Sequence, residues 1–325
     1  MKAFLKNLLF FVLGYLVLII VGILIPPTPR ASSSHIFAKL EKDELLKKVR
    51  SPRLILIGGS NISLSINSQI LKDSLDRNPI NTGISASIGL AYMLDNTLHY
   101  VRPKDIVIVS PEYSQFYDHL AYGTEDLLRT VLDVAPEEIF KLRGKQLWKM
   151  IKYVPKYAFS KFKLSEYSYE KDNNTIGIYE RRSFNQYGDL YRHWGLGPKK
   201  ITPLEPPSVY DHTVVDLLYE YKQKVEDKGA TLYITFPAFH KASFENQIEE
   251  IATIEKELKY KGFVLLGNPE RYKMPEDIMF DTPYHLTKEG VDFRTQLLIH
   301  DLKKTLLHNL AAPPLKTSST GRKTN

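Results

Sequence analysis

The sequence predicts an α/β protein built on a parallel β-sheet, with a helical insertion and an apolar helix at its amino terminus. Short β-rich runs alternate with helical runs before residue 117 and again after residue 200, a pattern typical of a parallel sheet covered on both faces. Residues 117–200 break this alternation. Residues 8–25 are uncharged and rich in Leu, Ile, Val and Phe, which is typical of a membrane span.

Composition narrows the class of protein. The 325 residues allow one large α/β domain with an insertion or two modest domains. The net charge of +7 fits either a surface near anionic lipid or polymer or an ordinary solvated surface, and no basic stripe of a nucleic-acid module is present. With no cysteine, disulfides and Cys nucleophiles are excluded, and the nine histidines show no metal-binding spacing. We therefore expect no metal, no diffusible cofactor and no nucleic-acid partner.

The apolar run from Leu8 to Ile25 is about 27 Å long as a helix, close to the hydrocarbon thickness of a bilayer. It ends in Pro26-Pro27 without a small-residue cleavage site, so it predicts a retained anchor; a cleaved signal peptide is the alternative. Lys2 and Lys6 favour a cytoplasmic amino terminus. The sequence thus predicts a single-pass protein of the cell (inner) membrane whose main domain lies on the extracytoplasmic side.

The elements follow in order. Residues 26–34 read as a Pro/Ser linker that stands off the membrane, and an amphipathic helix over 35–50 comes next. The predicted strands are 53–57, 79–81, 105–110, 231–236, 262–266 and 278–280. The helices expected between and after them cover 62–76, 88–100, 208–228, 244–260 and 286–309.

The predicted domain boundaries follow from the same pattern. Residues 1–30 form the anchor and linker, and residues 31–116 and 201–311 form the α/β domain. Residues 117–200 are rich in Tyr, Phe, Trp and Lys and read as an inserted cap, with helices near 124–133, 136–142 and 145–163. The polar tail, 312–325, is expected to be disordered.

Two motifs lie at the expected carboxyl ends of strands. Gly58-Gly59-Ser60-Asn61 follows a buried strand and precedes a helix, where a sharp turn lifts a serine clear of the sheet. Helix amides point at the same spot and favour developing negative charge. A nucleophilic serine is one interpretation; a phosphate-binding or packing glycine turn is the other.

The second motif is the loop from Phe280 to Leu286, which holds Asp281 and His285. A carboxylate can hold an imidazole in the tautomer that accepts a serine proton, so this loop can supply what Ser60 lacks. Alone, such a loop is an ordinary surface loop or helix cap; the two motifs together predict Ser60 as nucleophile, His285 as base and Asp281 as orienting acid.

These motifs resemble the conserved blocks of the SGNH (GDSL-type) hydrolase family, in the family's order and over about residues 53–305. Residues 58–61 resemble the first block. Residues 81–85 resemble the second, which implies that the Gly83 amide joins the Ser60 amide in an oxyanion hole. The Asp281–His285 loop resembles the last block. The resemblance implies a three-layer, flavodoxin-like sheet and acyl chemistry at the serine.

Three departures from the family pattern concern the site. Gly59 replaces the usual Asp before the nucleophile, and three residues rather than two separate Asp281 from His285, which leaves Asp277 as an alternative acid. The strand end at Ser110-Pro111-Glu112-Tyr113 lacks the family's oxyanion Asn. Asn61 could compensate. Glu112 reads as an acid supporting the site or as a solvent-facing residue.

The anchor, Gly-Gly-Ser-Asn, Ser-Pro-Glu-Tyr and Tyr-His-Leu together resemble exported partners of membrane-bound O-acyltransferases. That implies a seryl-ester enzyme that O-acylates, typically O-acetylates, a cell-surface polysaccharide or polymer, with such an acyltransferase as partner. A carbohydrate esterase of the same fold and an inactive membrane-tethered scaffold are the alternatives. In residues 184–194, Asn185 and Asp189 stand among aromatic residues, a pattern that fits either sugar binding or a small core.

Overall fold

The computed structural model describes residues 1–168 and 177–311. Its centre is a mixed α/β body with a five-stranded parallel sheet in the order β2-β1-β3-β4-β6. The strands are β1 (Arg53–Gly58), β2 (Asn78–Asn81), β3 (Ile106–Ser110), β4 (Thr231–Thr235) and β6 (Leu265–Leu266). The predicted fold class is confirmed at this level. The tail at 312–325 lies outside the described residues.

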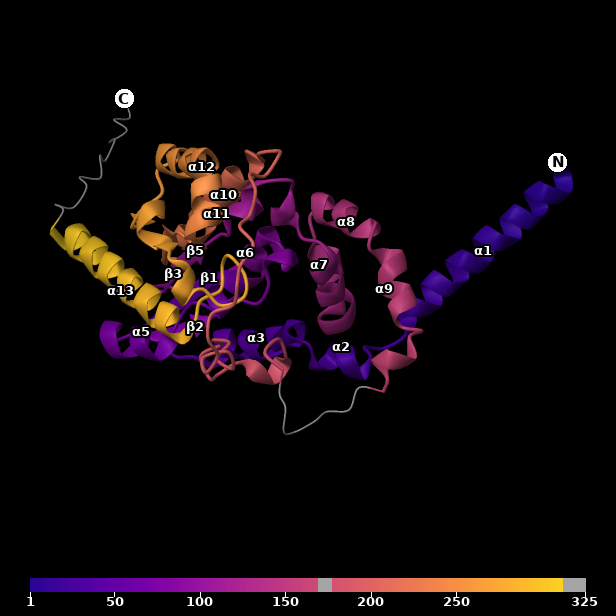
Figure 1. Ribbon diagram of the computed structural model, residues 1–325, viewed down its shortest axis with the longest axis horizontal. Helices are drawn as coiled ribbons and strands as arrows, with labels where there is room; N and C mark the ends of the chain where they lie inside the picture. Colours follow the sequence, from indigo (N-terminus) through magenta and orange to yellow (C-terminus); the bar gives the residue numbers. More distant parts are fainter. Residues whose placement is uncertain (169–176, 312–325) are drawn as a thin grey trace, which may run out of the picture.

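Alternate residues of the strands divide the core into two layers, as the pleat requires. Ile55, Val107 and Leu232 pack with helices α6 (Leu90–Leu98), α10 (Thr213–Asp227) and α12 (Ile248–Tyr260). On the other face, Leu54 and Ile108 pack with α5 (Ser68–Leu75) and α13 (Lys288–Ala311). Figure 1 shows α13 and α5 side by side along one side of the sheet.

Several predicted elements differ at their ends or in kind. The helix expected over 62–76 is two helices, α4 (Ser60–Ser63) and α5, because the Asp189 carboxylate accepts the Ser68 backbone N–H and fixes a new helix start. The helix expected over 244–260 is α11 (Lys241–Asn246) followed by α12. The strand expected over 262–266 is only two residues long.

The strand expected at Ile278–Phe280 is wrong. Residues Glu276–Ile278 form a 3₁₀ turn, and Met279 makes a single antiparallel bridge to Leu286. A strand needs a neighbouring ladder along its length, and here the chain instead closes a tight loop over 280–285. A small parallel pair, β5 (Phe239–His240) with β7 (Lys273–Met274), was not predicted.

Residues 117–200 contain no strand among those described, only bridges and short helices. These are α7 (Glu125–Arg129), a π-helical turn at Thr130–Val134, a 3₁₀ helix at Pro136–Lys141, α8 (Gly144–Ile151), α9 (Val154–Ser160) and three further 3₁₀ turns. Figure 1 shows α8 and α9 between the sheet-containing body and α1.

Helix α1 (Lys2–Leu24) is long and apolar enough to span a membrane, with a mean hydropathy of 2.7 over its best window. It projects away from the rest of the molecule (Figure 1). The segment after it is not the free linker that the Pro/Ser composition predicted. It folds into α2 (Pro29–Ser33), a 3₁₀ turn (His35–Ala38) and α3 (Lys39–Lys48), and Thr28 caps α2 through the Ala31 N–H.

Candidate functional site

Ser60 stands where the sequence predicts it, at the carboxyl end of β1 and the first residue of α4. The two residues before Ser60 are glycines because the neighbouring backbone leaves no space for a side chain at either position. A Cβ on Gly58 would lie 2.7 Å from the Ser110 carbonyl oxygen, and one on Gly59 would lie 2.6 Å from the Ala86 nitrogen. The usual Asp of the expected motif therefore has no room at position 59, because the backbone at residue 86 passes directly over it.

Glu112 follows β3 and faces Ser60. Ser60 Oγ donates a hydrogen bond to Glu112 Oε1 at 3.2 Å, and the Asn61 backbone N–H donates to the same oxygen at 3.2 Å. Glu112 is only 5% exposed, and this burial raises the pKa of its carboxyl group above the usual range. Glu112 is thus not a solvent-facing residue at a strand end; it is the direct partner of the candidate nucleophile.

In the loop expected to supply the base, the side chains of Asp281 and His285 bond to each other. Asp281 Oδ1 lies 2.7 Å from His285 Nδ1, so the extra residue between them does not prevent the pair from forming. Burial alone would raise the pKa of Asp281, but hydrogen bonds from His285 and Tyr179 outweigh it and hold the pKa below the ordinary value. Asp277, the alternative acid, is exposed in the 3₁₀ turn before the loop.

Tyr179, which lies in the insertion, completes this pair. Its hydroxyl donates to Asp281 Oδ2 at 2.6 Å and lies 3.1 Å from His285 Nδ1. Burial and the hydrogen bond to Asp281 raise the pKa of the phenol, so it remains a neutral donor. No sequence motif marked Tyr179, because its position depends on how the insertion folds back.

The two halves of the site are fastened to each other through Tyr284. Ser65 Oγ donates to the Tyr284 carbonyl oxygen at 2.9 Å, and the Ser114 N–H donates to the Tyr284 hydroxyl at 3.3 Å. Ser65 follows the nucleophile turn, and Ser114 follows Glu112. Three segments far apart in sequence therefore meet at the carboxyl edge of the sheet, where ligands of open α/β sheets bind.

Ser60 and His285 do not share a hydrogen bond in the described chain; the Ser60 hydroxyl is engaged by Glu112 instead. His285 nevertheless influences Glu112. Burial is the dominant effect and raises the pKa of Glu112, whereas the charge of His285 lowers it. The Glu112 carboxyl group therefore bonds to Ser60 and responds to the charge of His285.

The Gly83 amide is not free to bind an oxyanion. It donates to Asn81 Oδ1 at 3.0 Å, within a tight contact in which a Cβ on Gly83 would lie 2.7 Å from the Gly59 carbonyl oxygen. The amide that the second motif predicts as an oxyanion donor is therefore already bonded within a local turn. Gly83 instead lets the chain after β2 pass close to the nucleophile turn.

The Asn61 side chain does not compensate for the missing oxyanion donor either. Its Nδ2 atom donates to the Ser110 carbonyl oxygen at 3.0 Å and to the Ser110 hydroxyl at 3.1 Å, and the residue is fully buried. This amide ties the start of α4 to the end of β3.

Arg294, on α13, is a buried cation that sequence reasoning missed. Its guanidinium donates to the Asn61 carbonyl oxygen at 2.5 Å, and also to the Ser110 hydroxyl and the Phe236 carbonyl oxygen. Burial lowers its pKa to about 10, so it stays protonated at neutral pH. A signal was present: Val291 and Leu298, three residues before and four after, place Arg294 on the buried stripe of α13.

Asn185 and Asp189 lie in a buried network, not on a sugar-binding surface. The fully buried Asp189 carboxylate accepts hydrogen bonds from Ser68, Asn81 and Asn185. The chain turns at Gly188, whose φ is +91° and where a Cβ would lie 2.2 Å from the Asn81 carbonyl oxygen. This segment fastens the insertion to β2, so the small-core interpretation holds for both residues.

Across residues 1–168 and 177–311, no group of three or more His, Asp or Glu side chains is placed to hold a metal ion. The side chains that make up the candidate site are Ser60, Glu112, Asp281, His285, Tyr179 and the buried Arg294.

The class of protein defined by this fold is a mixed α/β protein with a parallel five-stranded sheet and one N-terminal apolar helix. No family model matches the chain, and no curated protein matches it. Among solved structures, the chain is similar to the crystal structure of protein YxiM from Bacillus subtilis, with 12% identity over 79% of this chain and a TM-score of 0.38. The chain spans 58% of the length of that structure.

Proposed function

We propose that this chain is a serine-dependent acyl-transfer enzyme of the SGNH type, anchored in the membrane by α1 with its active domain outside the cytoplasm. The observation that carries the proposal is the meeting of three segments at the sheet edge: Ser60 after β1, Glu112 after β3, and the paired Asp281 and His285 before α13. A serine, an imidazole and an orienting carboxylate are the groups that acyl transfer through a seryl ester requires.

The proposed reaction has two halves. Ser60 Oγ turns from Glu112 towards His285 by rotation about its side-chain bond and attacks the acyl carbonyl carbon, while its proton passes to His285. The leaving alcohol takes that proton as it departs and leaves an acyl-serine. An acceptor hydroxyl then attacks the ester carbonyl, gives its proton to His285, and Ser60 is restored with that proton. Asp281 and Tyr179 hold the imidazole in position throughout.

Charge on the tetrahedral intermediate would be met by the backbone amides at the start of α4. The Asn61 amide is engaged by Glu112 in this structure, so the oxyanion and the Glu112 carboxylate compete for one donor. The protonated imidazole and the buried Arg294 guanidinium add positive charge nearby. We therefore propose that Glu112 regulates the site through its protonation.

The resemblance to exported partners of membrane-bound O-acyltransferases extends the proposal to the substrates. The acceptor would be a hydroxyl group of a cell-surface polysaccharide or polymer, and the acyl group, an acetyl in the simplest case, would come from such an acyltransferase in the same membrane. An esterase would use the same residues with water as the acceptor.

Intact-mass measurement tests the serine chemistry. The full chain in detergent micelles is exposed to p-nitrophenyl acetate beside Ser60→Ala and, as a matched control, Ser208→Ala, which removes an exposed hydroxyl. We expect one acetyl adduct on the native chain and on the control but not on Ser60→Ala. Equal acetylation of all three chains would overturn the proposal. Adding oligosaccharides to the acetylated chain then distinguishes transfer from hydrolysis by where the acetyl group goes.

A further inference from the structure

One stretch of the insertion is strongly basic. Residues 141–165 contain eight Lys and Arg residues and no Asp or Glu. Because the whole chain has a net charge of only +7, this stretch accounts for its positive balance and the remainder is close to neutral. Arg143, Lys156 and Lys161 pair with Asp95, Glu125 and Asp133, so the charge that can attract an anionic surface comes from the other five lysines of the stretch. Clustered positive charge of this kind attracts anionic phospholipid.

The same stretch exposes large apolar side chains. On α8, Trp148 is 72% exposed and Ile151 is 65% exposed, and Leu147 lies beside them. The chain after α8 adds Phe159, Phe162 and Leu164, the last 85% exposed. Several large exposed apolar side chains interspersed with lysines in one stretch are typical of elements that lie in a membrane interface, where Trp is also favoured.

Helix α9 places this apolar surface against α1. A Cβ on Gly22 would lie 2.5 Å from the Ala158 carbonyl oxygen, and the rings of Tyr15 and Phe159 have centroids 5.6 Å apart. Tyr15 and Gly22 are about 10 Å apart along the α1 axis. Helix α9 therefore runs beside the last turns of the apolar helix. Figure 1 shows α8 and α9 on the side of the body from which α1 departs.

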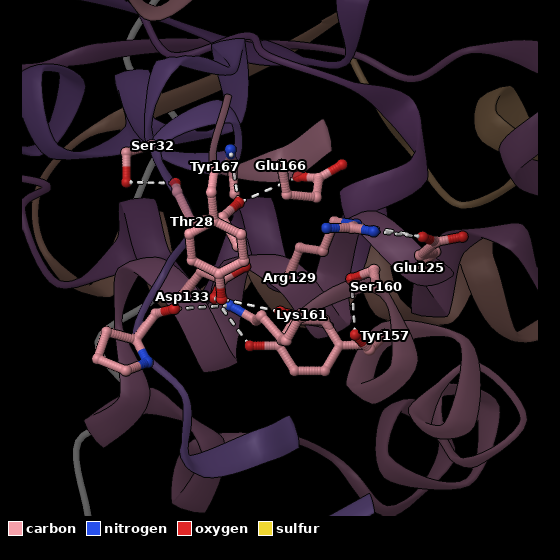
Figure 2. Close-up of polar contacts among 12 residues, drawn as sticks. Thr28, Ser32, Glu125, Arg129, Asp133, Tyr157, Ser160, Lys161, Glu166 and Tyr167 are labelled. Atoms are coloured by element: carbon pink, nitrogen blue, oxygen red, sulfur yellow. Dashed lines mark hydrogen bonds and ion pairs between the residues drawn. The ribbon is translucent and has the colours of Figure 1, made fainter. Parts of the chain in front are cut away.

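Hydrogen bonds hold α1 in this relation to the insertion. Lys161 Nζ donates to Asp133 at 2.6 Å and to the Pro26 carbonyl oxygen at 3.3 Å, just beyond the end of α1. The Tyr157 hydroxyl donates to the same Asp133 oxygen, and the Thr28 hydroxyl donates to Glu166. Figure 2 shows these side chains gathered at the junction. The orientation of the apolar surface relative to α1 is thus set by buried contacts.

We propose that this membrane-facing surface, defined as Leu147, Trp148, Ile151, Phe159, Phe162 and Leu164, lies in the interfacial layer of a bilayer that contains anionic phospholipid. Its apolar side chains enter the level of the acyl-chain boundary, and the lysines around them meet lipid phosphates. The occupant is lipid because the surface continues the apolar wall of α1 and carries the charge that complements an anionic headgroup layer. The inference rests on α1 spanning the bilayer and is independent of the chemistry at Ser60.

The two tryptophans of the chain make a direct test. The full chain with Trp194→Phe keeps only Trp148 as a fluorophore, and the full chain with Trp148→Phe keeps only the half-buried Trp194. Each is reconstituted into phosphatidylcholine vesicles, with and without phosphatidylglycerol, in which some acyl chains are brominated. Brominated acyl chains quench only fluorophores that reach the hydrocarbon boundary.

We expect brominated lipid to quench Trp148 at least several-fold more than Trp194, and more strongly when phosphatidylglycerol is present. Adding Ile151→Glu to the Trp194→Phe chain puts a charge on the same face of α8 and should reduce that quenching. If Trp148 is no more quenched than Trp194 and stays open to acrylamide in water, the proposal is wrong. If Trp148 is shielded from both quenchers, a protein contact covers the surface and the lipid assignment is overturned.

Discussion

Glu112 is the residue whose position changes the understanding of the site most. A motif can indicate that a strand ends in an acid, but the hydrogen bond from Ser60 to that acid depends on the register between β1 and β3, which pairs Gly58 with Ser110. The buried carboxyl accepts hydrogen bonds from the Ser60 hydroxyl and the Asn61 amide, the two groups that the proposed reaction uses. An ionised Glu112 therefore opposes the proposed reaction, and a protonated one does not.

We predict that Glu112→Gln increases the rate of Ser60 acetylation at pH 8 by roughly ten-fold. A neutral amide oxygen competes less strongly than a carboxylate for the Asn61 N–H, which recovers part of the factor, on the order of 10²–10³, that a lost oxyanion donor typically costs. As the pH falls through the raised pKa of Glu112, the native carboxyl becomes neutral and the two chains should converge. Rapid-quench measurement of adduct formation against pH checks this, with exposed Glu137→Gln as the control. A slower Glu112→Gln chain at every pH would instead assign the carboxylate as a required base.

The residues of the site differ in how far sequence reasoning could find them. Ser60, Asp281 and His285 stand in short motifs next to strands and helices, so their positions could be predicted, and the structure pairs two of them directly. Tyr179 reaches the site through tertiary packing, which no local pattern records. The helical periodicity around Arg294 indicates that it is buried but not which groups it binds. For Asn185 and Asp189 the sequence left two interpretations open, since a polar-aromatic composition is shared by sugar sites and by buried networks that fasten one segment to another.

At the scale of elements, the junction between α1 and the insertion depends on one buried ion pair. The side chains of Lys161 and Asp133 are 1% and 3% exposed, and Asp133 also accepts the Tyr157 hydroxyl. Removing one partner of such a pair leaves an uncompensated charge in a site without water, whereas removing both does not.

We therefore predict that Lys161→Met lowers the free energy of unfolding by about 3–5 kcal/mol. The double variant Lys161→Met with Asp133→Leu should recover much of that loss. Lys156→Met removes an exposed ion pair with Glu125 and should change stability by less than about 1 kcal/mol. Thermal unfolding of the full chains in detergent micelles compares them. A Lys161→Met chain as stable as Lys156→Met would contradict the role assigned to the pair.

Element prediction from sequence succeeded where burial and periodicity agree and failed where tertiary partners decide. The long buried runs became β1, β3 and β4 within a residue or two. The apolar run at Ile278–Phe280 has the composition of a strand but only one bridging partner, Leu286. The Pro/Ser composition of residues 26–34 predicted a free linker, yet capping by Thr28 and a contact with Glu166 make this segment part of the folded junction.

At the scale of the whole molecule, composition and alternation were enough to predict an α/β body and an apolar amino-terminal helix, because each depends on long runs of residues. The relation between those parts could not be read from the same runs. It depends on the close packing of Gly22 against Ala158 and on the hydrogen bond from the first residue of α5 to Asp189.

We predict that the full chain stays in the membrane fraction after alkaline carbonate extraction, since α1 carries a mean hydropathy of 2.7 and is almost wholly unburied. In intact spheroplasts, protease added outside should digest the domain, because Lys2 and Lys6 favour a cytoplasmic amino terminus. Immunoblotting before and after membrane disruption measures this. Protection of the domain until the membrane is broken would reverse the proposed orientation.

The folded junction after α1 also sets the reach of the molecule. An enzyme tethered by a loose stalk can sweep a broad volume and follow its substrate outwards, but here the chain leaves Leu24 and is held within a few residues by Pro26, Thr28 and α2. Helix and domain then tilt and travel as one piece. Under the proposed function, Ser60 would stay at one height above the lipid, and only the stretch of polymer passing that height would be modified.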